Sequence, residues 1–418
     1  MKQTFVVIFV LSFFCATVFA QEPEQWSRFR GPNGQGISTA TDLPTKWSTT
    51  ENVAWHTPIP GEGWSSPVIW NDHIFLTSTT DNGQECRLIA VNRKNGTILW
   101  NKLVFTQEPR HKHDRNSYAT PTPVTDGHRV YALFGSGGFV AADFEGNIVW
   151  TKIDLHFASQ HGMGTSPIIY GDLLITSINP TDKDDGFQIP WNKSYLLALD
   201  KNTKEERWRG TRGMSRIGHS VPVVIRVNGK DQILSMTGDI IQGFEPSTGE
   251  LIWTVKNSGE PAVPTPAIGD GLIFTSTRLT TPILAIRPDG KGDVTQTHVV
   301  WEQERNSPMT ASFLYVKPCL YSACDTGTFS AFDAATGKVL WQQRHEGRFD
   351  SSPIYADGKI YVTTHIGETT VYKPNADPTK PAEVLAVNEM DATVQATLAI
   401  AGKHLFIRTD KELWCIGK

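Results

Sequence analysis

One short apolar segment recurs eight times along the chain and limits the folds that the sequence can adopt. In its clearest form, Ser66-Pro67-Val68-Ile69 is followed by the turn pair Asn71-Asp72 and by a second apolar anchor at Phe75. The second anchor lies eight positions after the first in seven copies, and the copy at Pro222 has a turn four residues longer. Recurrence every 40 to 56 residues is typical of a repeat architecture. The first anchors are Pro67, Pro123, Pro167, Pro222, Pro266, Phe313, Pro353 and Leu398.

A second half-repeat completes each unit and, in most copies, ends on tryptophan. The sixth copy reads Ser330-Ala331-Phe332-Asp333, then Thr336-Gly337, then Val339-Leu340-Trp341. Gly and Asn between the runs supply the positive φ that tight hairpins require. Each unit is therefore predicted to form four short strands, and such sheets bury both faces when they pack radially. We expect the tryptophan, on the outer strand, to cover the seam between neighbouring sheets.

The last unit lacks a fourth strand of its own. It ends at Trp414-Cys415-Ile416 after three strands, whereas Asn52-Val53-Ala54-Trp55 near the N-terminus has the outer-strand pattern with its Trp. Donation of this strand would close the ring and leave no open radial edge. The sequence thus predicts an all-β, eight-bladed β-propeller of four-stranded blades, closed by an N-terminal strand. Seven blades is the alternative, because the seventh outer strand, Val384-Leu385-Ala386-Val387, lacks a Trp.

The half-repeat carries a family resemblance. Its pattern Ala-x-Asp-x-x-Thr-Gly-x-x-x-Trp is complete from Ala331 to Trp341 and resembles the PQQ-repeat propellers, which include quinoprotein alcohol dehydrogenases and the outer-membrane assembly lipoprotein BamB. The resemblance covers most of the chain and implies the propeller fold. The segment Trp26-Ser27-Arg28-Phe29-Arg30-Gly31-Pro32 is similar to an N-terminal signature of secreted members. We expect it to pack on the propeller rather than to form a domain.

The N-terminus predicts export. Lys2 precedes a nearly continuous apolar run from Phe5 to Phe19, and Ala20 supplies the small residue that a signal peptidase needs. That run is shorter than the roughly 20 residues that span a bilayer, and no later stretch approaches this length. We predict a signal peptide at residues 1–20, an N-terminal extension at 21–51 and the propeller at 52–418. The protein is expected in the periplasm or outside the cell, as a monomer without a transmembrane segment.

Charge and cysteine content limit the function classes. A net charge of −4 gives no basic face of the kind that binds nucleic acid. Cys86, Cys319, Cys324 and Cys415 are too few for a disulfide scaffold in an exported chain of this length. Cys319 and Cys324 are five apart in one predicted strand and so point to opposite faces. We interpret all four as buried small apolar residues, with their redox state left open.

Strand order assigns the turns to two faces. The turns that join first to second and third to fourth strands are uniformly tight, whereas the loops that lead into each blade, here called leading loops, are long and variable. They lie at the predicted loop-rich face, where binding residues concentrate. The residue three before each anchor should ring the mouth of the central channel: Trp64, Thr120, Gly164, His219, Val263, Thr310, Asp350 and Gln395.

A concave mouth ringed by aromatic, basic and polar side chains suits a small polar or anionic ligand. The alternative is that these Arg and His residues cap loops and contact solvent. No catalytic motif is recognisable, and the pair His111 and His113 has no third metal ligand at a fixed offset. We therefore predict neither a catalytic nor a metal site. The candidate ligand- or partner-binding residues are Trp64, Arg115, Tyr118, His161, Arg216, His219, Arg305, Arg348 and Asp350.

Three functions compete. The first is a non-catalytic binding or scaffolding propeller, similar to BamB, that recognises an envelope protein or a small polar ligand at its loop-rich face. The second is a quinoprotein dehydrogenase with PQQ and calcium; the resemblance would then imply an adjacent Cys-Cys pair, which the chain lacks. The third is a polysaccharide-active enzyme, for which paired acids are expected around the channel. Asp350 has only Glu62 and Glu260 as companions in other leading loops.

Overall fold

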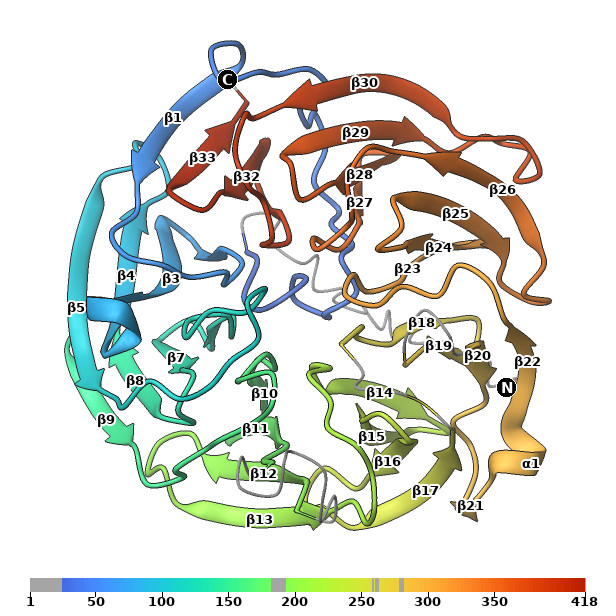
Figure 1. The fold of residues 1–418 in the computed structure, drawn as a ribbon, viewed down its shortest axis with the longest axis horizontal. Helices are drawn as coiled ribbons and strands as arrows, with labels where there is room; N and C mark the ends of the chain where they lie inside the picture. Colours follow the sequence, from blue (N-terminus) through green and yellow to red (C-terminus); the bar gives the residue numbers. More distant parts are fainter. Residues whose placement is uncertain (1–24, 182–192, 258, 260–262, 278–281, 418) are drawn as a thin grey trace, which may run out of the picture.

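The computed structural model describes residues 25–181, 193–257, 259, 263–277 and 282–417. They form eight sheets that follow one another around a common axis (Figure 1), and in each sheet the four strands of the blade pair antiparallel. The only helices among these residues are one 3₁₀ turn, η1 (Asp81–Gly83), and one α-helical turn, α1 (Thr295–His298). The prediction of an all-β propeller with eight four-stranded blades is confirmed, and the seven-blade alternative is wrong.

The first four blades are built from consecutive strands. Blade 1 contains β2 (Val68–Trp70), β3 (His73–Thr80), β4 (Glu85–Asn92) and β5 (Ile98–Thr106). Blade 2 contains β6 (Val124–Thr125), β7 (Arg129–Leu133), β8 (Phe139–Asp143) and β9 (Ile148–Lys152). Blade 3 contains β10 (Ile168–Tyr170), β11 (Leu173–Ile178), β12 (Tyr195–Asp200) and β13 (Glu206–Thr211). Blade 4 contains β14 (Val223–Val227), β15 (Lys230–Met236), β16 (Ile240–Phe244) and β17 (Leu251–Lys256), and its outer edge pairs with β21 (Gly292–Asp293).

The remaining blades continue the pattern until the last. Blade 5 contains β18 (Ala267–Gly269), β19 (Leu272–Thr275), β20 (Ile283–Ile286) and β22 (Val299–Gln303). Blade 6 contains β23 (Leu314–Val316), β24 (Cys319–Ala323), β25 (Thr328–Asp333) and β26 (Val339–Arg344). Blade 7 contains β27 (Ile354–Ala356), β28 (Lys359–Thr363), β29 (Glu368–Lys373) and β30 (Glu383–Glu389). Blade 8 combines β31 (Ala399–Ala401), β32 (His404–Arg408) and β33 (Glu412–Ile416) with β1 (Val53–Pro58).

Strand β1 closes the ring as predicted. It pairs antiparallel with β33, with Val53 opposite Ile416 and Trp55 opposite Cys415. Trp55 also packs against Phe406, with ring centroids 6.0 Å apart. Because the N-terminal strand belongs to the same sheet as the C-terminal ones, the ring opens only when this pairing breaks.

In five of the eight blades, the tryptophan of the repeat joins its blade to the next one at the outer radius. The Trp100 indole N–H of blade 1 donates to the Phe144 carbonyl of blade 2 at 2.7 Å. The same bond runs from Trp55, Trp150, Trp208 and Trp301 to carbonyls of the following blade, at 3.0 to 3.1 Å. The expectation that these rings cover the seams is thereby confirmed.

The glycine of the half-repeat is the partner of that tryptophan. A Cβ at Gly96 would lie 2.5 Å from the Trp55 ring, and one at Gly337 would lie 2.5 Å from the Trp301 ring, each ring belonging to the preceding blade. Both glycines also have positive φ, 74° and 73°. Turn geometry and close approach thus require glycine at the same position. The recurring Gly and Trp therefore encode contacts between units as well as within them.

A second set of contacts joins the blades near the axis. The residue before each anchor is Ser or Thr in seven blades, and in six of these its hydroxyl accepts the backbone N–H of the corresponding residue in the preceding blade. Six such bonds measure 2.9 to 3.3 Å; their acceptors are Thr122, Ser166, Thr265, Ser312, Ser352 and Thr397. We call these residues the hydroxyl ring. In blade 4 the equivalent residue is Val221, which has no hydroxyl to accept such a bond.

The N-terminal segment Trp26 to Ser38 crosses the channel at the end that carries the tight turns. Trp26 exchanges two backbone hydrogen bonds with Ile69 of blade 1, at 2.8 and 2.9 Å. On the other side of the axis, the Gln35 side chain bonds the backbone at Pro266 and Ile268 of blade 5, and Ser38 N–H donates to Tyr355 of blade 7. The central blue trace of Figure 1 follows this path. The segment, here called the plug, therefore packs on the propeller through blades on opposite sides.

The four cysteines of the described residues are buried and free. Burial raises the pKa of the Cys415 thiol to about 12 and raises that of Cys86 further. Cys319 begins β24, but Cys324 follows the strand, which ends at Ala323. The two residues thus do not share one strand as the sequence had suggested. The predicted signal peptide at 1–20 lies outside the described residues. Within those residues, no helix is long and apolar enough to cross a membrane.

The hydroxyl ring yields a prediction about stability. Ser352→Ala removes the acceptor of the Ser312 N–H and leaves that buried donor unpaired, so we expect a loss of about 1–3 kcal/mol in unfolding free energy. Ser351→Ala is the matched control, because the buried Ser351 hydroxyl has no hydrogen-bond partner. Urea unfolding followed by tryptophan fluorescence measures both. Equal shifts for the two variants would contradict the role of the ring.

Candidate functional site

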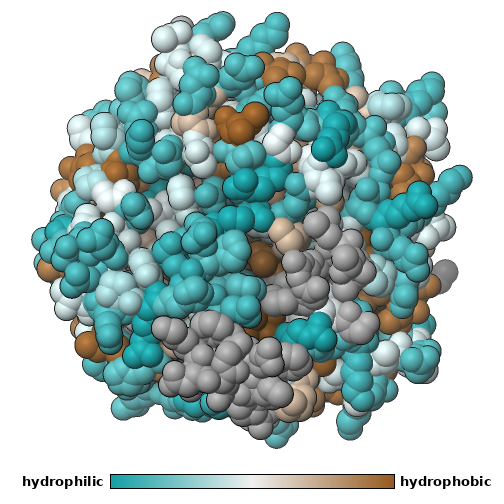
Figure 2. All heavy atoms as spheres, viewed as in Figure 1, coloured by the Kyte–Doolittle hydropathy of each residue, from teal (hydrophilic) through white to brown (hydrophobic). Residues whose placement is uncertain are grey.

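A cavity of about 670 Å³ occupies the central channel at its loop-rich end. All eight residues of the predicted mouth ring line it, from Trp64 in blade 1 to Gln395 in blade 8. The residues of the hydroxyl ring and Phe29 of the plug line the cavity as well. Because the plug crosses the tight-turn end, the channel is a pocket rather than a through-hole. The face of the disc drawn in Figure 2 carries mostly hydrophilic residues around its centre.

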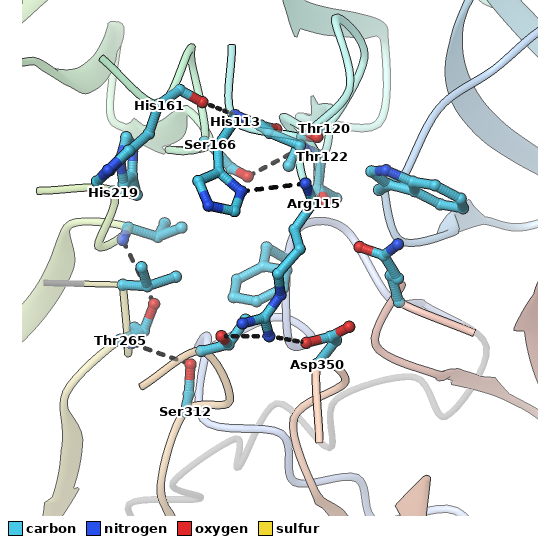
Figure 3. A pocket seen from close by; sticks show the side chains of 18 of the residues that line it. His113, Arg115, Thr120, Thr122, His161, Ser166, His219, Thr265, Ser312 and Asp350 are labelled. Carbon is cyan, nitrogen blue, oxygen red and sulfur yellow. Dashed lines mark hydrogen bonds and ion pairs between the residues drawn. The ribbon is translucent and has the colours of Figure 1, made fainter. Parts of the chain in front are cut away.

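One arginine crosses the cavity. Arg115 belongs to the loop between β5 and β6, and Figure 3 shows its side chain extending from that loop across the pocket to Asp350. It bonds Asp350 of blade 7, and it bonds Asp325 of blade 6 at 2.9 Å. Burial alone would lower the pKa of Arg115, but Asp350 and Asp325 raise it above its ordinary value. Arg115 thereby holds opposite sides of the ring together.

The two carboxylates are themselves held from other directions. Asp350 accepts the Arg348 Nε–H with both oxygens, at 3.0 and 3.2 Å. Asp325 accepts the backbone N–H groups of Met309 and Thr310 at 2.9 and 3.1 Å. Their side chains are only 3% and 6% exposed. Arg115, Arg348, Asp325 and Asp350 therefore form one paired cluster whose formal charges cancel.

Three histidines form a row on the side of the pocket built by blades 2 to 4 (Figure 3). The ring centroids of His113 and His161 are 5.7 Å apart, and those of His161 and His219 are 5.5 Å apart. Nε2 of His219 lies 3.4 Å from Nδ1 of His161. Burial, followed by the neighbouring His161 and His113, lowers the pKa of His219 to about 3. His219 is therefore neutral at physiological pH and offers the pocket a polar, uncharged ring.

The structure brings six of the nine sequence-predicted residues into the cavity wall: Trp64, Arg115, His161, Arg216, His219 and Asp350. It does not place the other three there. The Tyr118 hydroxyl donates to the Arg110 carbonyl, and its ring packs against Gly83 and Gly135. Arg348 does not line the cavity but donates to Asp350, which does. Arg305 is exposed on its loop. Among the described residues, no group of three or more His, Cys, Asp or Glu side chains could hold a metal ion.

Several contributors were missed by sequence reasoning. The hydroxyl ring had a visible signal, since Ser or Thr precedes the anchor in seven of eight units. Phe29 also had one, because it lies within the N-terminal signature. Asp325 follows β24 in a turn and had none: only the fold brings it to Arg115, 210 positions away in the sequence.

The fold and site define an eight-bladed propeller whose plugged channel holds a polar pocket. The family model described as outer membrane protein assembly factor BamB matches residues 35–156 and 290–380, about half of the chain. The protein belongs to this family of PQQ-like repeat β-propellers. No curated protein sequence matches the chain.

Solved structures share the fold at low sequence identity. BamB from Moraxella catarrhalis aligns with a TM-score of 0.60 and 13% identity, over 88% of this chain and 97% of that one. A europium-containing methanol dehydrogenase aligns with a TM-score of 0.70 and 11% identity, over 95% and 99% of the two chains. A computationally designed protein, Ika8, aligns with a TM-score of 0.58 and 10% identity, over 86% and 98%. These likenesses concern the fold alone.

The arginine that crosses the pocket generates a second prediction. Arg115→Met leaves two buried carboxylates without their shared partner, so the unfolding free energy should fall by about 3 kcal/mol. Arg209→Met is the control, because Arg209 pairs with Glu206 on the exposed surface and its loss should cost less than about 1 kcal/mol. Urea unfolding of both variants tests this, and a loss no larger than that of the control would contradict a structural role for Arg115.

Proposed function

We propose that this protein is an exported, non-catalytic propeller that binds a small polar ligand in its plugged channel. The observation that carries the proposal is the pocket itself, which is closed at one end by the plug and lined by hydrogen-bonding side chains from all eight blades. Its volume of about 670 Å³ falls within the range of small-molecule sites. Export rests on the apolar run from Phe5 to Phe19, which is followed by the small residue Ala20.

The carboxylates of the pocket do not support polysaccharide hydrolysis. A general acid or base needs a titratable group that can reach the ligand and exchange a proton with it. Asp350 is the one acidic residue of the described lining, and Arg115 and Arg348 already hold it. Asp325, the second carboxylate of the cluster, does not line the cavity. The pair of free acids that polysaccharide hydrolysis requires is thus not available among these residues.

The residues present do not fit PQQ with calcium. Calcium takes six to eight oxygen ligands, commonly from several carboxylates. The described lining offers one carboxylate, and two guanidinium groups occupy its oxygens. The chain also lacks the adjacent cysteine pair that the quinoprotein resemblance implies. We therefore derive no oxidation step for this protein.

A protein partner remains the second candidate, because the matching family is described as an outer membrane assembly factor. The leading loops that would contact such a partner also form the pocket. The two functions differ in what they require: a small ligand needs the depth of the pocket, whereas a protein partner needs the rim.

Capture of a small molecule tests the proposal. The full-length mature protein is incubated with a small-molecule extract, separated by gel filtration, denatured, and analysed by mass spectrometry. Gln395→Trp fills the cavity from blade 8, where Gln395 lines it. Lys338→Trp places the same ring on an exposed turn of the opposite face. We expect a compound at about one per protein that Gln395→Trp loses and Lys338→Trp keeps, because filling removes the enclosed volume that a ligand occupies.

Capture by neither the native protein nor the control would contradict a small-molecule function. Equal capture by all three proteins would place the ligand elsewhere on the surface.

A further inference from the structure

Three arginines around the pocket are buried without a carboxylate partner. Arg30, Arg212 and Arg408 are 0%, 4% and 3% exposed. Arg30 donates to the carbonyls of Phe313 and Gln35 at 2.6 and 3.0 Å. Its Nε and Nη1 atoms have no hydrogen-bond partner.

The other two guanidinium groups also bond only neutral acceptors. Arg212 donates to the hydroxyls of Ser177 and Ser235 and to the Met236 carbonyl, and its Nε atom has no partner. Arg408 donates to Ser65 and to the Thr77 carbonyl. Among the described residues, no carboxylate forms an ion pair with any of the three. Their positive charges are therefore not compensated locally.

Each of these groups lies next to the wall of the cavity. Arg30 bonds the residue that follows Ser312 of the hydroxyl ring. Arg408 bonds Ser65, which lies between the lining residues Trp64 and Ser66. Arg212 bonds the Met236 carbonyl, which contacts the Cβ position of Gly218, between the lining residues Ile217 and His219. The three charges thus surround the pocket from the floor and from two sides.

These arginines remain charged despite their burial. Burial lowers the pKa of each to about 9, which leaves them mostly protonated at neutral pH. The other charges near the cavity largely cancel, because Arg115 and Arg348 are matched by Asp325 and Asp350, and Arg216 pairs with Asp239. Charge in a low-dielectric wall acts over longer distances than charge in water, and a cleft focuses its field.

We infer that Arg30, Arg212 and Arg408 make the pocket electropositive and that its ligand is a small organic anion, held by the field of the wall and by neutral hydrogen-bond donors rather than by a direct salt bridge. This inference deepens the proposed function and rests on it. A bound anion would compensate the buried charges, so that binding and the stability of the apo protein are coupled.

Quenching of Trp64 fluorescence measures the field without any knowledge of the ligand. The Trp64 signal is the difference between the native protein and Trp64→Phe. Stern–Volmer constants for iodide and for caesium, at constant ionic strength, are each divided by the constant for free N-acetyltryptophanamide. We expect the iodide value to exceed the caesium value about threefold or more, because a positive cleft concentrates anions. Equal values would overturn the inference.

Substitution identifies the source of the field. Arg30→Met and Arg408→Met should each lower the iodide-to-caesium ratio, while quenching by neutral acrylamide stays constant. Arg226→Met is the matched control, since Arg226 is exposed and pairs with Asp231 on a surface hairpin. If a variant fails to fold, the iodide-to-caesium ratio of the native protein still tests whether the pocket is electropositive. An unchanged ratio in both folded variants would assign the field to other groups and refute the role of these arginines.

The capture experiment separates this inference from the proposed function. A captured compound that is neutral or cationic overturns the anionic class and leaves the small-molecule function in place. If the iodide-to-caesium ratio is high but no compound is captured, the small-molecule function is contradicted and the electropositive character of the pocket is retained.

Discussion

Contact between neighbouring blades is the constraint on which the rest of the structure depends. A single four-stranded blade exposes both faces, and it becomes stable only when the next blade covers it. The contact is made at two radii: the tryptophan of one blade covers the glycine turn of the next near the rim, and the hydroxyl ring joins the first strands near the axis. Because these residues recur in most units, the angle between neighbouring blades repeats and eight units complete a circle.

The ring must also be closed, and the N-terminal part of the chain makes two contacts that do so. Strand β1 completes blade 8 beside β33, which removes the open radial edge. The plug then crosses the axis and bonds blades 1, 5 and 7. The first contact makes a ring, and the second turns its channel into a pocket. The polar lining, the crossing Arg115 and the buried arginines acquire a functional meaning only because the pocket has a floor.

Sequence reasoning predicted what repetition encodes. The eight anchors set the blade count, and counting back three positions from each anchor identified eight residues that line one cavity. It failed where a contact occurs once. Nothing near Arg115 indicates that it pairs with Asp325 on the opposite side of the ring. Tyrosine is a residue type common in binding sites, but Tyr118 packs against two glycines, and only the fold determines that placement. The path of the plug is likewise set by tertiary contacts rather than by a periodic pattern.

The N-terminal segment is an integral part of the propeller, because it supplies both β1 and the plug. Native-state hydrogen exchange of the full-length mature protein tests it most directly, because amides that open only with the whole structure share its slow exchange. Trp26 of the plug and Ile69 of blade 1 each donate a backbone N–H to the other's carbonyl, so both amides should exchange as slowly as those of β33. Rapid exchange of Trp26 with a fully protected β33 would show that the plug opens independently, and the pocket would lose its floor.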